Sequence, residues 1–405
     1  MKRPTQAVVL CGGLGTRLHP YTISTPKPMV DCNGKPFLWH LLTQISEQGI
    51  RDFLLLTGYL SQVIVDYFKD GYQFGWRIQY SDGPIGWDTG RRIWESRRLM
   101  HSNFLLLYSD NFSVFSLSKI NLTHVRRNTS ITLTVVKKSP GNIKIDNHGM
   151  VEKYDNNRSD TLKYVEIGYM IIERDRMFLS FTDKNSNFSE IIKNLVSQQE
   201  CNVLIQHDNY YSISDPKRWG LTKKYLLDKK IILIDRDGVI NKKAKKGCYI
   251  TEWKNFEWID DTIEAMKELS KCGFSFIIIT NQAGIGRKLV TQNEVDYIHD
   301  NMLKFFTLSK IKILDIYTCP HHWEDDCACR KPKPGMLLKA SMDHSFRLDR
   351  TVYIGDDFRD AEAAQNAGST GIIIGKSVKE LTMPEGVYYY PTLLQSVDFL
   401  KARLS

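Results

Sequence analysis

The stretch IILIDRDGVIN (residues 231–241) has the pattern of the first strand of an α/β domain, although it begins beyond the middle of the 405-residue chain. Its apolar run ends abruptly at Asp235, and a second aspartate, Asp237, and a glycine follow. Such an ending is typical of a buried strand with polar residues just beyond it. Further apolar segments, with amphipathic helical stretches between them, lie at 274–284, 313–320 and 351–357. This order predicts a second α/β domain over residues 229–405.

A similar beginning lies near the N-terminus, where AVVLCGGLGTRL (residues 7–18) joins an apolar run to a glycine-rich turn. Later apolar segments predict that a mixed sheet continues from it, and they lie at 55–59, 104–111, 131–136 and 164–172. We therefore expect a first α/β domain over residues 1–225. The segment 221–230, LTKKYLLDKK, is the expected junction.

Composition excludes several classes of protein. With 42% hydrophobic residues, the chain has enough apolar side chains for two cores. No apolar run reaches the roughly 18 residues of a membrane span, and the first residues lack the apolar region of a signal peptide. We therefore expect a cytoplasmic protein without a membrane partner. A homo-oligomer stays possible on this reasoning.

The net charge of +9 raises the question of nucleic acid. No stripe of aromatic residues interleaved with Lys and Arg is present, and no block of five like charges. A modest surplus of this kind suits small polyanionic substrates. We expect no nucleic-acid partner.

Three of the eight cysteines lie close together, and the other five are scattered without a disulfide spacing. Cys319, His321, Cys327 and Cys329 give the pattern C-x-H-x₅-C-x-C, which has the softness and number of ligands of a closed, structural Zn²⁺ site. His322 is the competing nitrogen ligand. The ion would fold the loop and place the two cations that follow it, Arg330 and Lys331, at a phosphate site.

The glycine turn of the first domain is suited to an anion. Its glycines allow backbone amides to approach a phosphate closely, and Arg17 adds a positive charge. In TPKPM (residues 25–29), prolines on both sides hold Lys27 in one direction.

Together, GGLGTRL and PKPM resemble the signature of the sugar-phosphate nucleotidylyltransferase family, over residues 5–225. The resemblance implies a Rossmann-like mixed sheet and transfer of a nucleotidyl group from an NTP to a sugar 1-phosphate, with pyrophosphate leaving. It implies that Lys27 lies near the reacting phosphates and that Asp110 holds Mg²⁺. The residues implied to hold the triphosphate are Gly12, Gly13, Gly15, Thr16 and Arg17, and those implied to meet the sugar phosphate are Glu152, Lys153, Glu166 and Gly168.

Two segments depart from that family's pattern. WDTG (residues 87–90) stands where G-T-A-G is usual, and SISDP (residues 212–216) stands where D-I-G-T-P supplies a second metal aspartate. Ser212 takes the place of that aspartate. Either Asp215 or Asp88 provides the missing carboxylate, or one metal contact is lost.

The second domain has the residues of a phosphoryl-transfer site. Asp235 and Asp237 are two residues apart in an extended segment, so their side chains would point to the same side. There they can bind Mg²⁺ together. One can also attack phosphorus while the other transfers the proton of the leaving group. This resembles the D-x-D-G motif of the haloacid dehalogenase superfamily. The resemblance implies a Rossmannoid fold. It implies that Thr280 and Asn281 contact the phosphoryl group and that Arg330 and Lys331 supply the cations. It also implies that Asp356 is an Mg²⁺ ligand, together with Asp235 and Asp237.

With its zinc loop, the segment 229–380 closely resembles the bacterial D,D-heptose 1,7-bisphosphate phosphatases. Histidinol-phosphate phosphatases share the loop, so the loop alone does not select the substrate. A heptose bisphosphatase, however, leaves a sugar 1-phosphate, which a nucleotidylyltransferase consumes. The two resemblances together imply a bifunctional enzyme acting on heptose phosphates and an NTP, with GTP and the α-anomer favoured. Such a product implies use in lipopolysaccharide, capsule or an S-layer glycan.

Two alternatives stay open. The transferase could use mannose 1-phosphate, or ATP, CTP or UTP. In the other alternative, WDTG and SISDP mark a catalytically silent first domain that binds a nucleotide or sugar and regulates a working phosphatase.

Overall fold

Strand β1 (Gln6–Leu10) lies inside the first sheet and is buried on both faces. Ala7 and Val9 belong to one hydrophobic cluster, and Val8 and Leu10 belong to the other. Successive side chains of a strand point to opposite faces, so the unbroken apolar run of β1 is suited to a sheet that is covered on both sides. The glycine turn begins where this strand ends.

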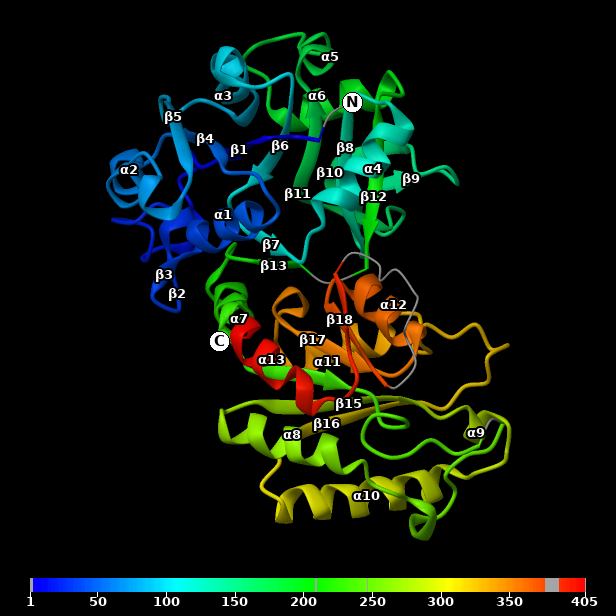
Figure 1. The fold of residues 1–405 in the computed structure, drawn as a ribbon. Helices are drawn as coiled ribbons and strands as arrows, with labels where there is room; N and C mark the ends of the chain where they lie inside the picture. Colours follow the sequence, from blue (N-terminus) through cyan, green and yellow to red (C-terminus); the bar gives the residue numbers. More distant parts are fainter. Residues whose placement is uncertain (1–2, 208–209, 246, 376–385, 405) are drawn as a thin grey trace. The chain divides into compact units, whose positions relative to one another are not determined.

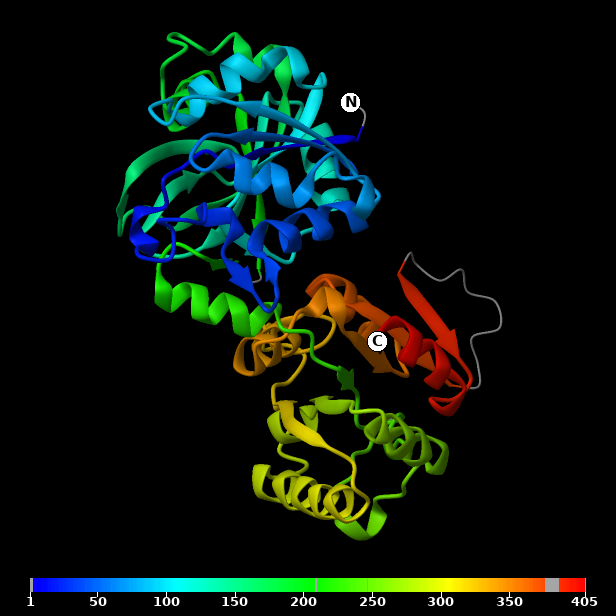
Figure 2. The same ribbon diagram turned by 90° about the vertical axis from the view of Figure 1, so that its left-hand side faces the viewer.

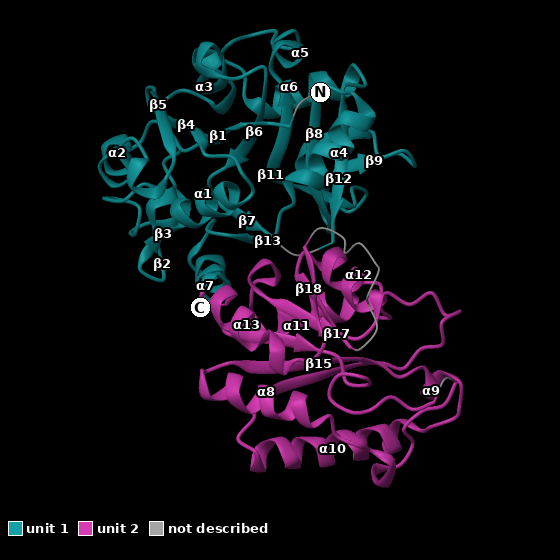
Figure 3. Ribbon diagram, in the orientation of Figure 1, with its two compact units in different colours: residues 1–226 teal, residues 227–405 magenta. Residues whose placement is uncertain are grey.

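The computed structural model describes residues 3–207, 210–245, 247–375 and 386–404. The chain divides into two compact units, residues 1–226 and 227–405 (Figure 3). Residues 376–380, the end of the segment with the phosphatase resemblance, lie outside the described residues. Within the described residues, no helix is both long and apolar enough to cross a membrane.

The first unit contains a nine-stranded mixed sheet (Figure 1). Its main path has the order β10-β9-β11-β6-β1-β4-β5, with β8 paired to β11 and β12 paired to β8. The pairs β1–β4, β1–β6, β4–β5 and β8–β12 are parallel, and those of β11 are antiparallel. The other strands of this sheet are β4 (Asp52–Thr57), β5 (Arg77–Asp82), β6 (Asn103–Tyr108), β8 (Ile131–Lys137), β9 (Gly141–Ile145), β10 (Val151–Ser159), β11 (Tyr164–Glu173) and β12 (Cys201–Gln206).

Helices cover both faces of this sheet, because each of its two hydrophobic clusters contains side chains from the strands and from helices. Helices α1 (Phe37–Glu47), α2 (Ser61–Phe68) and α4 (Leu117–Arg127) pack on one face, and α3 (Thr89–Ser96), α5 (Arg174–Phe178) and α6 (Phe188–Ser197) pack on the other. Two small antiparallel pairs and a final helix complete the unit: β2 (Asp31–Cys32) with β3 (Lys35–Pro36), β7 (Asn111–Ser113) with β13 (Tyr210–Ser212), and α7 (Pro216–Leu226).

The second unit contains a six-stranded sheet in which every pair is parallel. Its order is β16-β15-β14-β17-β18-β19. The strands are β14 (Ile231–Ile234), β15 (Ser275–Asn281), β16 (Ile313–Cys319), β17 (Val352–Gly355), β18 (Thr370–Ile374) and β19 (Val387–Tyr390). Strand β14, in the opening stretch of the sequence analysis, lies between β15 and β17 and is fully buried.

Helices α8 (Asp260–Lys271), α10 (Gln292–Leu308) and α13 (Val397–Arg403) pack on one face of this sheet, and α11 (Gly335–His344) and α12 (Phe358–Ala367) pack on the other. A short helix, α9 (Ala283–Gly286), follows β15. Figure 2 shows the same fold from another side, with α10 in yellow and α13 in red. The predicted class is confirmed: a mixed Rossmann-like sheet first and a Rossmannoid parallel sheet second.

Candidate active sites

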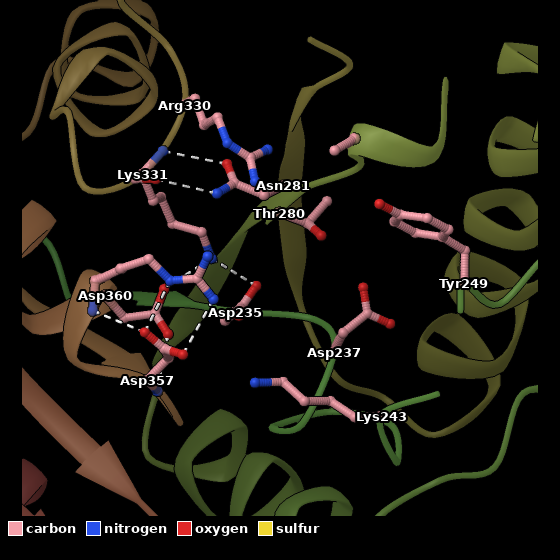
Figure 4. A pocket seen from close by; sticks show the side chains of 12 residues that line it. Asp235, Asp237, Lys243, Tyr249, Thr280, Asn281, Arg330, Lys331, Asp357 and Asp360 are labelled. Carbon is pink, nitrogen blue, oxygen red and sulfur yellow. Dashed lines mark hydrogen bonds and ion pairs between the residues drawn. The ribbon is translucent and has the colours of Figure 1, made fainter. Parts of the chain in front are cut away.

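The carboxyl ends of parallel strands meet at one edge of the second sheet, and polar side chains gather there. Asp235 directly follows β14, Thr280 and Asn281 end β15, and Asp356 directly follows β17. In open α/β sheets this edge is where ligands bind. A pocket opens at it, and the predicted residues Asp235, Asp237, Thr280, Asn281, Arg330 and Lys331 line it (Figure 4).

Lys331 is the buried cation of this pocket. Its Nζ lies 2.9 Å from Asp235 Oδ1 and 2.8 Å from Asp360 Oδ1, and its side chain is 4% exposed. The Tyr353 hydroxyl lies 2.9 Å from the same Nζ. Burial lowers the pKa of Lys331, but the two carboxylates raise it above its ordinary value. Lys331 therefore remains an ammonium group.

The carboxyl group of Asp235 is harder to ionise than an ordinary aspartate. Burial raises its pKa to about 7, Lys331 opposes the rise, and Asp360 adds to it. A further cation at this edge would favour the ionised form. Ionisation is what a nucleophilic carboxylate needs.

Asp237 is surrounded by hydrogen-bond donors. Arg236, which is 1% exposed, donates to both of its oxygens, Asn241 donates to Oδ1 and Gln282 donates to Oδ2. Burial alone would raise the pKa of Asp237, but Arg236, Asn241 and Gln282 lower it below its ordinary value. The other side of the Arg236 guanidinium faces Nε2 of His299 at 3.0 Å.

The geometry fits a divalent cation at Asp235, Asp356 and Asp360. One carboxylate oxygen of each lies within 4.8 Å of the others. Asp356 Oδ1 is buried and has no hydrogen-bond partner among the described residues, which is costly unless a ligand binds it. Carboxylate oxygens are the ligands that Mg²⁺ prefers. Asp237, which the sequence placed in this set, is not in that group of three, and its side-chain oxygens accept the bonds described above.

Asn281 and Arg330 lie beside Lys331. The Asn281 side chain makes two hydrogen bonds to the Lys331 backbone. Its Nδ2 donates to the Lys331 carbonyl at 3.3 Å, and its Oδ1 accepts from the Lys331 N–H at 3.2 Å. Thr280 Oγ1 accepts a bond from Gln282, which also donates to Asp237. Asn281 therefore positions the lysine, and Arg330 is half-buried at the wall of the pocket.

The cysteine–histidine cluster is assembled as a tetrahedral site requires. Cys319 ends β16, and its Sγ lies 3.3 Å from that of Cys329 and 3.7 Å from that of Cys327. Nδ1 of His321 lies 3.1 Å from Cys329 Sγ. Ligands of a tetrahedral Zn²⁺ are about 3.3–3.8 Å apart, whereas disulfide sulfurs are about 2 Å apart. His322 instead lies against Trp323, with ring centroids 3.8 Å apart.

The glycine turn of the first unit packs closely against Lys27. Gly15 has φ +65°, and a Cβ there would lie 2.8 Å from Lys27 Cβ. Only glycine adopts this conformation without strain, so the turn and Lys27 pack directly together. Gly13, Thr16 and Arg17 are exposed beside them. Short 3-10 turns hold the two segments, Thr16–Leu18 and Lys27–Met29.

Lys27 forms an ion pair with Asp110. The resemblance implied that both residues belong to one site. The Nζ atom of Lys27 lies 2.6 Å from Asp110 Oδ2. Asp110 lies in the tight connection between β6 and β7, beyond the carboxyl end of a strand next to β1. Glu166 is close enough for the Asp110 charge to raise its pKa.

Glu166 and Gly168 form an irregular point in β11. The strand shifts register between Glu166 and Met170, and Gly168 has φ +83°, where an added Cβ would lie 2.8 Å from Tyr108 Cβ. Glu166 accepts a hydrogen bond from the Gly168 N–H. Burial raises the pKa of Glu166 to about 8, against the lowering by this bond.

Glu152 and Lys153 lie on the edge strand β10 and are exposed. Their ion pairs are with Lys144 and Asp155. The structure therefore does not pair them with Lys27 or Asp110.

The structure places the residues of both segments that depart from the family pattern. Ser212 pairs with Asn111 across β13 and β7, next to Asp110, and its Oγ lies 3.1 Å from Ser214 Oγ. Asp215 instead accepts the Arg218 N–H at the start of α7, and Asp88 precedes α3. Among the described residues, both clusters of three or more possible metal ligands lie in the second unit.

Comparisons with known proteins agree with this division. The family model described as nucleotidyl transferase matches residues 6–219, more than half of the chain, and that described as polynucleotide kinase 3 phosphatase matches 230–370. A D-glycero-alpha-D-manno-heptose-1,7-bisphosphate 7-phosphatase of Campylobacter jejuni is 38% identical over 176 residues, 43% of this chain and 97% of that protein. The chain belongs to the nucleotidyl transferase family and, in its second unit, to the family of these phosphatases.

Two further relatives extend the picture of this transferase–phosphatase. A D-glycero-beta-D-manno-heptose-1,7-bisphosphate 7-phosphatase of Escherichia coli K12 is 35% identical over 158 residues, 37% of this chain and 81% of that protein. A crystal structure from Bacillus anthracis assigned as a glucose-1-phosphate thymidylyltransferase shares the fold of the transferase unit, with a TM-score of 0.50, 13% identity, and coverage of 54% of this chain and 93% of that one. The protein is a bifunctional enzyme, a nucleotidyltransferase and a phosphatase.

Sequence reasoning missed several residues of the transferase–phosphatase. The segment GDDFRD contains Asp360, whose position suits a capping residue at the start of α12. Only the fold shows that Asp360 also forms an ion pair with Lys331. Arg92 gave no signal, yet its buried guanidinium lies against the glycine turn, where a Cβ on Gly12 would be 2.4 Å from its Cζ. It donates to the carbonyls of Thr57, Gly83 and Pro84.

Proposed function

We propose that the enzyme removes the 7-phosphate of D-glycero-D-manno-heptose 1,7-bisphosphate and then transfers a nucleotidyl group, GMP from GTP, to the resulting heptose 1-phosphate. Magnesium serves both reactions, and zinc holds the loop that ends at Arg330.

One observation supports this proposal above the others: a nucleotidyltransferase and a relative of 7-phosphatases are joined in one chain. The relatives' printed activity removes the phosphate at C7, which leaves the phosphate at C1. A sugar 1-phosphate is the nucleophile that a sugar nucleotidyltransferase requires. A histidinol phosphatase would make nothing that the first unit could use.

In the phosphatase reaction, Asp235 attacks the 7-phosphorus in line, and the bond from phosphorus to the sugar oxygen breaks. Asp237 gives its proton to the departing oxygen, because the incoming phosphate, a negative neighbour, raises the pKa of that carboxyl group. Lys331 and Arg330 stabilise the charge on the transferring phosphoryl group. Water then attacks the aspartyl-phosphate while Asp237 takes its proton, which releases phosphate and restores Asp235.

Asp235, Asp356 and Asp360 would hold Mg²⁺, which when bound offsets the charge of the phosphoryl oxygens. Cys319, His321, Cys327 and Cys329 would hold Zn²⁺ in a closed structural site. Because Arg330 and Lys331 directly follow the last of these ligands, folding of the loop and placement of the two cations are linked.

In the transferase reaction, amides of the turn from Gly12 to Thr16 hold the triphosphate, and Arg17 neutralises part of its charge. Lys27, oriented by Asp110, lies beside the reacting phosphates. An oxygen of the sugar 1-phosphate attacks the α-phosphorus and pyrophosphate leaves. Glu166 and Gly168 contact the sugar, and Glu152 with Lys153 reaches its phosphate only if the edge strand moves from its present ion pairs. Asp110 would hold Mg²⁺, which when bound offsets phosphate charge.

The α-anomer is proposed because the relative with 38% identity is named for it, although the Escherichia coli relative with 35% is named for the β form. The test incubates the enzyme with each anomer of heptose 1,7-bisphosphate, or with mannose 1-phosphate, and with each of the four NTPs. Phosphate and pyrophosphate are followed separately. The proposal predicts phosphate first and then pyrophosphate, fastest with GTP and the α-anomer. Pyrophosphate only with another NTP, or only with mannose 1-phosphate, would overturn the assigned specificity. Phosphate without pyrophosphate from any NTP would overturn the proposed transferase reaction.

A further inference from the structure

The side chain of Lys243 reaches into the phosphatase pocket and ends at Asp356. Its Nζ lies 2.6 Å from Asp356 Oδ2, while the two side chains are 44% and 16% exposed. Lys243 lies in the segment that leaves the Asp235–Asp237 turn, and it lines the pocket opposite Lys331 (Figure 4). A second cation therefore lies at a carboxylate of the candidate metal group.

Gly238 makes this contact possible. It has φ +94°, and a Cβ there would lie 2.1 Å from Asp356 Oδ2 and 2.8 Å from Lys243 Cε. Any side chain at this position would separate the lysine from the carboxylate. The lysine stem thus passes directly over the glycine to reach Asp356.

The two oxygens of Asp356 are in different states. Oδ2 is neutralised by Lys243, while Oδ1 is buried and without a hydrogen-bond partner among the described residues. The same carboxylate lies with those of Asp235 and Asp360 in the group that fits a divalent cation. A lysine and a metal ion would therefore meet on one carboxylate, where their positive charges oppose each other.

Lys243 differs from Lys331 in how firmly it is held. Lys331 is 4% exposed and contacts two carboxylates and a tyrosine hydroxyl. Lys243 is half-exposed, and its ion pair in the described part of the chain is with Asp356. A partly exposed ion pair with one partner contributes little free energy and can separate readily.

We propose that Lys243 is a built-in counter-ion of Asp356, whose positive charge opposes the divalent cation and which moves away when that cation binds. Once displaced, its ammonium group is left at the mouth of the pocket, where it can meet an anionic group of the substrate. Because the two events are linked, substrate anion and metal ion each favour binding of the other. The inference rests on the proposed phosphatase reaction only in that Asp356 holds the metal.

The test measures Mn²⁺ affinity by the electron paramagnetic resonance signal of the free ion, on zinc-loaded full-length enzyme without substrate. Lys243→Met should bind Mn²⁺ about fivefold more tightly than the wild type, because the metal no longer displaces an ion pair. The matched control is Lys242→Met, whose side chain pairs with Glu257 at 2.7 Å and is 65% exposed. This control should bind as the wild type does, and Asp356→Asn should remove the affected site.

Equal or weaker Mn²⁺ binding by Lys243→Met would overturn the inference. So would equal tightening in Lys242→Met, since that result would be a general effect of net charge. If Asp356→Asn bound Mn²⁺ as the wild type does, Asp356 would not be a metal ligand. That result would overturn the metal site of the proposed phosphatase as well, so the two failures can be told apart.

Discussion

Lys27 and Asp110, 83 residues apart in the chain, form an ion pair with Nζ 2.6 Å from Oδ2 at the carboxyl-end edge of the first sheet. It joins the loop after the glycine turn to the end of a different strand, so the fold has to be complete before the pair exists. The second unit has its own lysine–carboxylate pair on its own sheet. We therefore expect two activities that substitutions can remove one at a time.

Asp235→Asn tests the phosphatase site. Removing the nucleophile should lower the rate of phosphate release from heptose 1,7-bisphosphate by at least about 10³-fold. Nucleotidyl transfer to purified heptose 1-phosphate should continue at the wild-type rate. Loss of both activities in a folded variant would contradict the assignment of separate sites.

Lys27→Met tests the transferase site. Loss of a cation beside the reacting phosphates should lower kcat/KM for pyrophosphate release by about 10²–10³-fold. Phosphate release should be unchanged. Lys35→Met is the matched control, because Lys35 is exposed and lies over the Trp39 ring at 5.5 Å. A full rate of transfer in Lys27→Met would remove Lys27 from the mechanism.

Ser212→Asp tests the missing carboxylate. The Ile213 N–H donates to the Asp110 carbonyl at 3.0 Å, so position 212 is next to the metal aspartate that the resemblance implies. A second carboxylate there should lower the Mg²⁺ concentration that gives half-maximal transferase activity several-fold. Ser212→Asn, of the same shape without charge, should leave that concentration at the wild-type value or raise it. No difference between the two variants would mean that Ser212 does not face the metal.

His321→Asn and His322→Asn separate the two candidate zinc ligands. We expect about one zinc ion per chain in the wild type and in His322→Asn, measured by inductively coupled plasma mass spectrometry. His321→Asn should retain much less zinc and should unfold at a lower temperature in its second unit, because metal binding and folding of the loop are linked. The reverse order of zinc contents would place His322 in the site.

The raised pKa of Glu166 predicts that the protein becomes less stable as the pH rises. The folded protein keeps a proton on Glu166 up to about pH 8, whereas the ordinary pKa of the group is 4.5. The folded state therefore binds more protons between these values, and this contribution to the free energy of unfolding is lost as the pH rises through them. Glu166→Gln has no carboxyl group to ionise, so its free energy of unfolding does not fall in this way. The Tm of this variant minus that of the wild type should therefore increase from about pH 5 to about pH 9. A constant difference in Tm would mean that Glu166 is ionised in the folded protein.

Much of the fold follows from local patterns. The apolar runs before Gly12 and before Asp235 each indicated a buried strand with a site at its end, and both are strands covered on two faces. Cys319, His321, Cys327 and Cys329 could be grouped from spacing because one short loop brings them together.

Other features depend on contacts between distant segments. Asp237 was predicted as a metal ligand from its spacing, and in the structure its oxygens accept bonds from Arg236, Asn241 and Gln282. Asp360 lies in the candidate group with Asp235 and Asp356, which the sequence did not indicate. No pattern in the sequence indicates that Gly12 packs on Arg92 or that Lys243 reaches Asp356 over Gly238. These contacts arise only when separate loops meet at the edge of a sheet.

The most direct test of two independent sites is complementation. Asp235→Asn and Lys27→Met are each incubated with heptose 1,7-bisphosphate and GTP, alone and mixed, and the nucleotide-activated heptose is measured. Neither variant alone should form product, whereas the mixture should, because heptose 1-phosphate released by one variant is used by the other. No product from the mixture, although each variant keeps its remaining activity, would contradict the account.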